Sequence, residues 1–121
     1  MTYTVRNSDT PVIVNGWPVI VPTAQDGGTI RKDEILVDYE VISQSEVDEI
    51  IQDAARAGEN DAVALLRRTV KGISGQVDEQ KNPIPFNDDT FSAALNRTNQ
   101  RGAMLNSLFD VLGGRKAARK N

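Results

Sequence analysis

The sequence predicts an α+β fold, with an N-terminal antiparallel β-hairpin or meander followed by about four α-helices. Two observations predict this fold. Residues 1–42 are rich in β-branched side chains and place an Asn-Gly pair between two apolar runs, which is typical of strands joined by a tight turn. Residues 43–112 carry apolar side chains at helical spacing, interrupted by residues that begin or end helices. The alternative is a mainly α fold with a small β-hairpin.

The extended part can pair in two ways. Apolar runs at 12–14 and 17–21 flank Asn15-Gly16, the favoured pair for a type I′ turn, and predict a hairpin. The run 34–42 alternates between an apolar face and a more polar one, as in a strand covered on one side. Pairing of 18–21 with 34–41 competes with the hairpin, and a three-stranded meander contains both.

Two helices are expected after residue 42. Ser43 or Ser45 begins the first, because either hydroxyl can cap the free amides of the first turn, and Gly58 ends it. The second begins near Asn60 and runs to Lys71, where basic side chains in the last turn suit the helix dipole. The short junction between the two helices predicts that they pack against each other in antiparallel directions.

Two more helices are expected near the C-terminus. Asn87 or Asp88 caps the first of them, and a break is expected at 96–100. The last helix covers residues 101–112, and its inner stripe is expected to consist of Leu105, Leu108, Phe109 and Leu112.

Length and composition predict one domain, 1–121, divided into an extended part (1–42), a helical part (43–112) and a flexible basic tail (113–121). The chain has no cysteine and no histidine, which excludes thiol and imidazole catalysis and Cys/His zinc sites. Its apolar runs are too short to span a bilayer, and its N-terminus lacks the pattern of a secretory signal. A cytoplasmic protein is therefore expected.

Charge is distributed unevenly along the chain. Residues 26–61 carry eleven acidic and three basic side chains, a net charge of −8, whereas residues 62–121 carry ten basic and five acidic ones, a net charge of +5. Such a two-ended chain favours head-to-tail self-association, in which opposite charges steer the encounter. Solvated surface charge without a partner is the alternative.

No catalytic, cofactor-binding or metal-binding residue is predicted. The carboxylate pairs Asp78-Glu79 and Asp88-Asp89 are the candidates for acid/base chemistry or a cation, but acids beside a helix start are explained by the helix dipole. Gly72 and Gly75 follow a predicted helix instead of leading into one, so their amides are not arranged to bind phosphate.

Six residues form the candidate partner interface. Met104 and Val111 widen the stripe of the last helix, and are either core or a side open to a partner helix. Trp17 is either the main aromatic of a small core, which is favoured, or an anchor for a partner. Ile84, Arg115 and Lys116 complete the set.

The stretch 70–89 resembles the tail assembly chaperones of long-tailed (siphophage-type) bacteriophages. A helix end, a Val-x-Gly turn, a segment like Gly-Val-x-Asp and a Pro-x-Pro-Phe run precede an acidic helix start. The matching residues are Val70, Gly72, Gly75, Val77, Asp78, Pro83, Pro85 and Phe86. Asn82 stands where a glycine is common, and asparagine can take the left-handed conformation in its place. The two prolines predict an extended rod that tucks Phe86 under the third helix and presents Ile84 to a partner.

The resemblance implies a non-enzymatic factor for tail morphogenesis. Such a chaperone binds the tape measure protein, helps recruit tail tube subunits through a longer frameshifted form, self-associates, acts in the host cytoplasm and is absent from the mature virion. Neither a membrane nor nucleic acid is an expected partner. The alternative is a small DNA-associated regulatory protein that uses the C-terminal helices and the basic tail, against which the excess of acidic residues argues.

Overall fold

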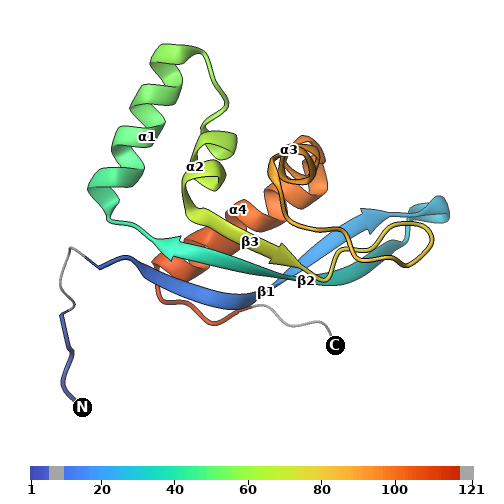
Figure 1. The fold of residues 1–121 in the computed structure, drawn as a ribbon, viewed down its shortest axis with the longest axis horizontal. Coiled ribbons are helices and arrows are strands. Elements are labelled where there is room, and N and C mark those ends of the chain that lie inside the picture. The colour runs from blue at the N-terminus through green and yellow to red at the C-terminus, as the bar shows by residue number, and fades with distance from the viewer. Residues whose placement is uncertain (6–9, 118–121) are drawn as a thin grey trace.

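A computed structural model describes residues 1–5 and 10–117 of the chain. Its sheet contains three antiparallel strands in the order β1-β2-β3: β1 (Val12–Ala24), β2 (Ile30–Val41) and β3 (Val70–Ser74). A short 3-10 turn at Asp26–Gly28 joins β1 to β2. Figure 1 shows that β1 and β2 continue beyond the end of β3 as a two-stranded ribbon.

Four helices accompany the sheet: α1 (Gln44–Ala57), α2 (Asp61–Thr69), α3 (Asp88–Asn96) and α4 (Thr98–Leu112). α1 packs on α2, while α4 packs on β1 and β2. The predicted α+β class is confirmed, and the mainly α alternative is wrong because 30 residues in three strands form the sheet. Among the described residues, no helix combines the length and the apolar character that crossing a membrane needs.

Local sequence signals place the helix ends. The Ser43 hydroxyl accepts from Glu46 N, Asn60 caps α2 through Val63 N, and Asn87 forms a capping box with Thr90. Gly58 ends α1 with φ 69°, as predicted. The sequence left two candidate caps for each of these helices, and the structure uses Ser43 and Asn87.

The predicted turn at Asn15-Gly16 is wrong. Val12–Ala24 is one strand. The register of its pairing with β2 shifts between Val14 and Trp17, so Asn15 and Gly16 form a β-bulge. Gly16 has the positive φ (66°) that was expected, but a bulge and a tight turn share this requirement. The Asp38 side chain holds the bulge, because its Oδ1 accepts a 2.8 Å hydrogen bond from Gly16 N.

The predicted helix at 60–71 ends early, at Thr69, and the chain continues directly as β3. Val70 and Ile73 are buried, so the strand contributes to the core. Gly72 lies against Asp38 on β2: a Cβ atom at this position would be 2.7 Å from Asp38 Oδ2. The third strand of the sheet therefore comes from the part of the chain predicted to be helical, and the meander within residues 1–42 is corrected to two strands.

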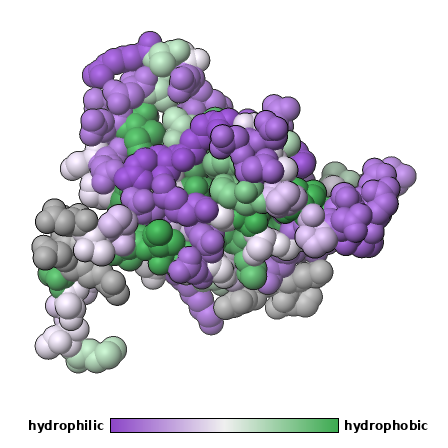
Figure 2. All heavy atoms as spheres, viewed as in Figure 1, coloured by the Kyte–Doolittle hydropathy of each residue, from purple (hydrophilic) through white to green (hydrophobic). Residues whose placement is uncertain are grey.

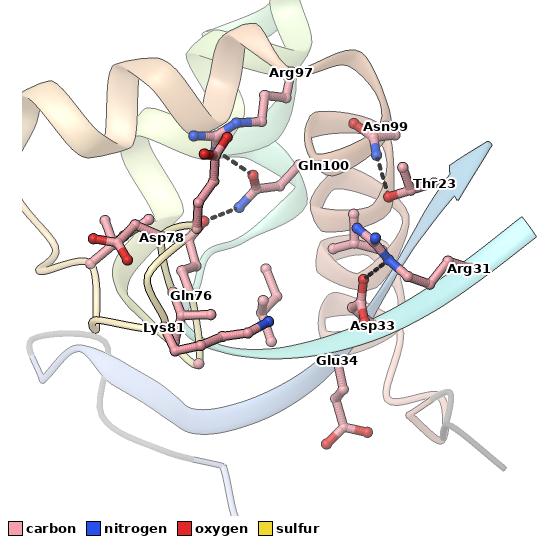
Figure 3. Close-up of a pocket in the computed structure, with 16 residues that line it drawn as sticks. Thr23, Arg31, Asp33, Glu34, Gln76, Asp78, Lys81, Arg97, Asn99 and Gln100 are labelled. Carbon is pink, nitrogen blue, oxygen red and sulfur yellow. Dashed lines mark hydrogen bonds and ion pairs between the residues drawn. The ribbon is translucent and has the colours of Figure 1, made fainter. Parts of the chain in front are cut away.

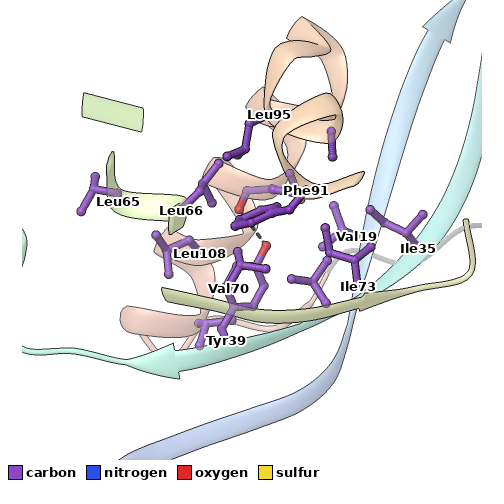
Figure 4. Close-up of a cluster of buried hydrophobic side chains, with 14 of the residues drawn as sticks. Val19, Ile35, Tyr39, Leu65, Leu66, Val70, Ile73, Phe91, Leu95 and Leu108 are labelled. Carbon is purple, nitrogen blue, oxygen red and sulfur yellow. Dashed lines mark hydrogen bonds between the residues drawn. The ribbon is translucent and has the colours of Figure 1, made fainter. Parts of the chain in front are cut away.

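The core lies between the sheet and the helices (Figure 4). Val19, Val37 and Tyr39 from the sheet are wholly buried against helix residues that include Leu66, Met104 and Leu108. The Tyr39 hydroxyl donates a 2.8 Å hydrogen bond to the Met104 carbonyl oxygen. Burial, followed by the nearby Asp110 carboxylate, raises the pKa of Tyr39, so its hydroxyl remains a donor at neutral pH.

The junction between α3 and α4 is one residue, Arg97, instead of the predicted break over 96–100. Phe86 packs on α3 as predicted, with its ring 5.2 Å from that of Phe91, although Phe86 keeps 37% of its surface exposed. The Arg67 guanidinium lies 5.8 Å from the Phe91 ring centre on α3, which ties α2 to this aromatic pair.

Replacing Gly72 tests the close approach of β3 to Asp38. Gly72→Ala should lower the free energy of unfolding by about 1–3 kcal/mol, because the added methyl group displaces the carboxylate that holds the bulge. In an Asp38→Ala background the same change should cost less than about 0.5 kcal/mol, since the clashing atoms are gone. Urea unfolding of the four proteins measures both costs; equal costs in the two backgrounds would contradict this account.

Candidate functional site

An open groove with a volume of about 730 Å³ lies where the β1–β2 ribbon, the loop after β3 and the start of α4 meet (Figure 3). Apolar side chains and polar or charged side chains both line it. The apolar ones are Val21, Ile35, Val77 and Ile84; the polar and charged ones include Arg31, Asp33, Gln76, Lys81, Arg97, Asn99 and Gln100. Its volume falls within the range of about 300–1,000 Å³ that is usual for ligand pockets.

A chain of side-chain hydrogen bonds fixes one wall of the groove. Arg97 Nη1 donates to Gln100 Oε1 at 2.7 Å, and Gln100 Nε2 donates to Gln76 Oε1 at 2.7 Å. Gln100 is only 5% exposed, so both ends of its amide are satisfied inside the protein. The start of α4 is thereby joined to the loop after β3.

A second set of bonds joins α4 to the ribbon. Asn99 Nδ2 donates to the Pro22 carbonyl oxygen at 2.8 Å and to Thr23 Oγ1 at 3.2 Å. Because Asn99 and Gln100 are neighbours on α4, the first turn of this helix holds both the ribbon and the loop. These hydrogen bonds therefore hold the groove together, although its residues come from four separate segments of the chain.

The loop between β3 and α3 contains a tight turn at 78–82, before the segment 83–86 that was predicted to be extended. Gln80 N and Asn82 N both donate to Asp78 Oδ1 at 2.9 Å, and an isolated bridge joins Val77 to Pro83. The residue in the left-handed conformation is Lys81, with φ 67°, whereas the sequence prediction assigned this conformation to Asn82. Asp78 therefore organises the turn.

The charges of the groove are mixed and solvated. Arg31 Nε and Asp33 Oδ2 pair at 2.8 Å, but their side chains are 60% and 51% exposed, so the pair contributes little to stability. Within residues 1–5 and 10–117, no group of three or more acidic side chains is placed to hold a metal ion. The groove therefore presents apolar surface, hydrogen-bonding groups and a solvated ion pair.

A second charged cluster joins four elements beside the sheet. Glu40 on β2 accepts from Arg68 at 2.8 Å and lies 3.6 Å from Lys71 Nζ, while Arg68 also contacts Glu46 at 3.0 Å. The hydrogen bond from Arg68 is the main reason why the pKa of Glu40 is lowered, and Glu40 in turn raises the pKa of Arg68. The cluster links α1, α2, β2 and β3, which is a structural role.

The six predicted interface residues do not come together. Met104 is wholly buried and Val111 is 9% exposed, so their assignment to a partner surface is corrected to the core. α4 turns this face to the sheet, and Phe109, predicted to be inside, is 38% exposed. The predicted inner position of Leu108 is confirmed.

The other four residues lie on three parts of the molecule. Trp17 is half-buried against the core, and its Nε1 atom has no hydrogen-bond partner among the described residues. Ile84 is half-buried and lines the groove. Arg115 is paired with Asp110 at 2.9 Å, and Lys116 is exposed. Of the predicted set, only Ile84 belongs to the groove.

Sequence reasoning missed most of the groove. Arg31, Gln76, Asn99 and Gln100 carry no motif, and they come from three parts of the chain that lie far apart in the sequence. One available signal was Gly75, whose φ of 87° turns the chain out of the sheet at the edge of the groove. Comparison of the chain with protein-family models, curated proteins and solved structures gives no match.

Lys81 provides a test of the turn that forms the groove wall. Lys81→Gly should raise the free energy of unfolding by about 0.5–1 kcal/mol, because glycine adopts the left-handed conformation without steric cost. Gln80→Gly is the matched control and should lower it by about 0.5–1 kcal/mol, since Gln80 has no positive φ. Thermal and urea unfolding measure both effects, and stabilisation by both glycines would contradict the role given to Lys81.

Acid titration tests the cluster at Glu40. A carboxylate whose pKa is lowered by folding stabilises the protein fully above its unfolded pKa, and this contribution is lost as the pH falls through the lower, folded value. Glu40→Gln should therefore reduce the free energy of unfolding by about 1–2 kcal/mol at pH 7. The difference between the two proteins should shrink as the pH falls below 4.5, the usual value for this side chain. A difference that stays constant down to pH 3 would contradict the pairing.

Proposed function

We propose that this chain is a non-enzymatic tail assembly chaperone of a long-tailed bacteriophage, which binds the tape measure protein and helps recruit tail tube subunits. The support from sequence is the stretch 70–86, whose matching residues form β3, the wall of the groove and the approach to α3. The support from geometry is a sheet that buries one face in the core while apolar side chains remain exposed on the other.

The outer face of the sheet is the proposed client surface. Ile20 and Leu36 alternate along their strands with the buried residues Val19 and Ile35, so they point away from the core. Leu36 is 39% exposed, and Ile13, which pairs with Glu40 on the same face, is 44% exposed. These three residues, Ile13, Ile20 and Leu36, are called the outer-face patch below.

A helical client suits such a surface. A sheet covered by helices on one face is completed by apolar helices on the other, because each element buries its apolar side against a second layer. Figure 1 shows α1, α2 and α3 on one side of the sheet, and Figure 2 shows hydrophilic side chains over α1 and at the tip of the ribbon. The outer-face patch is therefore a better docking surface for an apolar helix than the charged ends of the molecule.

The proposed mechanism is multivalent. Each copy binds a short part of a long client weakly, and contacts between neighbouring copies convert weak individual affinities into a stable coat. The acidic part (26–61) and the basic part (62–121) of neighbouring copies give these contacts their polarity. The proposal places the protein in the host cytoplasm and outside the finished virion, with tail tube subunits recruited by a longer frameshifted form.

Co-expression with a tape measure protein tests the proposal. The wild-type chain should keep the client soluble and co-purify with it, whereas Ile13→Asp with Leu36→Asp should abolish both effects by placing charges in the apolar contact. Ile51→Asp is the matched control, because Ile51 is an exposed apolar residue (36%) on α1, away from the patch, and should leave rescue unchanged.

Circular dichroism and thermal unfolding establish that each variant remains folded. If the wild-type chain neither forms a complex with the client nor keeps it soluble, the chaperone proposal fails. If the outer-face variant rescues as well as the wild type, the client binds elsewhere and the assignment of the surface is wrong.

A further inference from the structure

Part of β2 has an unpaired edge. β2 pairs with β1 from Ile30 to Val41, but β3 covers its other side only from Leu36 to Tyr39. Within residues 1–5 and 10–117, no strand pairs with 30–33 on the side away from β1, whereas Gly75 lies against Glu34 and Ile35. A free strand edge presents amide and carbonyl groups that can pair with another strand, and proteins normally cover such an edge or blunt it.

This edge opens into the groove. Arg31, Asp33, Glu34 and Ile35 line the groove, and Figure 3 shows the Asp33 and Glu34 side chains extending to opposite sides of the strand. Gly75 still lies against β2, since a Cβ atom at this position would be 3.6 Å from the Glu34 carbonyl oxygen. The chain leaves the sheet beyond Gly75, so the groove lies beside residues 30–33, where a longer β3 would pair. An added strand would therefore gain backbone hydrogen bonds from the edge and would place alternate side chains over Ile35 and Ile84.

The N-terminal arm, residues 1–5, has the properties of such a strand. Its sequence, MTYTV, consists largely of β-branched and aromatic residues, which favour strands. Tyr3 is 90% exposed and Val5 is 79% exposed, so the chain's own core covers neither side chain. Tyr3 and Val5 are also two residues apart, the spacing that puts both on one face of a strand.

We propose that the N-terminal arm of one copy adds as a strand to the 30–33 edge of a second copy and places Tyr3 and Val5 in its groove. Figure 1 shows that β1, which follows the arm in the sequence, begins at the end of the sheet opposite the ribbon, and this arrangement suits a contact between neighbouring copies. The contact is head-to-tail, because the arm and the groove are different surfaces. The inference rests on the self-association in the proposed function and gives it a structural route; client binding is tested separately.

Engineered cysteines test the contact directly, because the native chain has none. A Tyr3→Cys chain mixed with a Val77→Cys chain should form a mixed disulfide-linked dimer under mild oxidation, since Val77 lines the groove and is 49% exposed. A Tyr3→Cys chain mixed with an Ile51→Cys chain is the control and should give at least tenfold less mixed dimer. Equal yields from both mixtures would overturn the proposal, as would a Tyr3→Cys, Val77→Cys double variant that closes only within its own chain.

Sedimentation velocity provides the second test. The mean mass of the wild-type chain should rise with concentration, while Tyr3→Ser with Val5→Ser should remain monomeric over the same range. Both residues are exposed, so this variant should fold normally, and Ile51→Ser should assemble like the wild type.

Assembly of the Tyr3→Ser, Val5→Ser variant to the same extent as the wild type would reject the arm while leaving self-association intact. A wild-type chain that is monomeric at every concentration would reject both the arm contact and self-association. Neither result decides client binding, which the co-expression experiment measures independently.

Discussion

The hydrogen bond from the Tyr39 hydroxyl to the Met104 carbonyl oxygen is the interaction on which much of the structure depends. It is wholly buried and joins the C-terminal part of β2 to the middle of α4. Removing the Tyr39 hydroxyl would break this link between β2 and α4 and leave a small space in the core. Because it positions α4 on the sheet, it also positions Asn99 and Gln100, which hold the ribbon and the loop on either side of the groove.

The stretch 70–86 does more than connect two helices. It supplies an edge strand, leaves the sheet at Gly75, forms a turn around Asp78 and delivers Phe86 to the ring of Phe91. These tasks explain why glycine, aspartate and proline recur there, with no need for a phosphate or a metal. The same residues carry the resemblance to tail assembly chaperones, so the resemblance and the structure draw attention to one part of the molecule.

Local rules predicted the parts of the fold that are decided locally. The caps at Ser43, Asn60 and Asn87 need only a few neighbouring residues, and the sequence placed each of these helix starts to within one or two residues. Asn15-Gly16 gave a wrong prediction of a turn because a bulge requires the same positive φ at Gly16. Whether a bulge or a turn forms depends on Asp38, which is 22 residues away in the sequence. The buried face of α4 and the groove depend on contacts between distant segments, which periodicity does not encode.

The prolines of β1 limit which strand edges can pair with another copy of the chain. Pro18 and Pro22 lie on the outermost strand and have no amide hydrogen, and the Pro22 carbonyl oxygen already accepts from Asn99. The β1 edge is therefore poorly suited to strand addition. With one arm and one receptive edge, each molecule would have a valence of two, and two-valent units form unbranched chains. Their length would follow protein concentration instead of a fixed subunit number, which suits a covering for clients of different lengths.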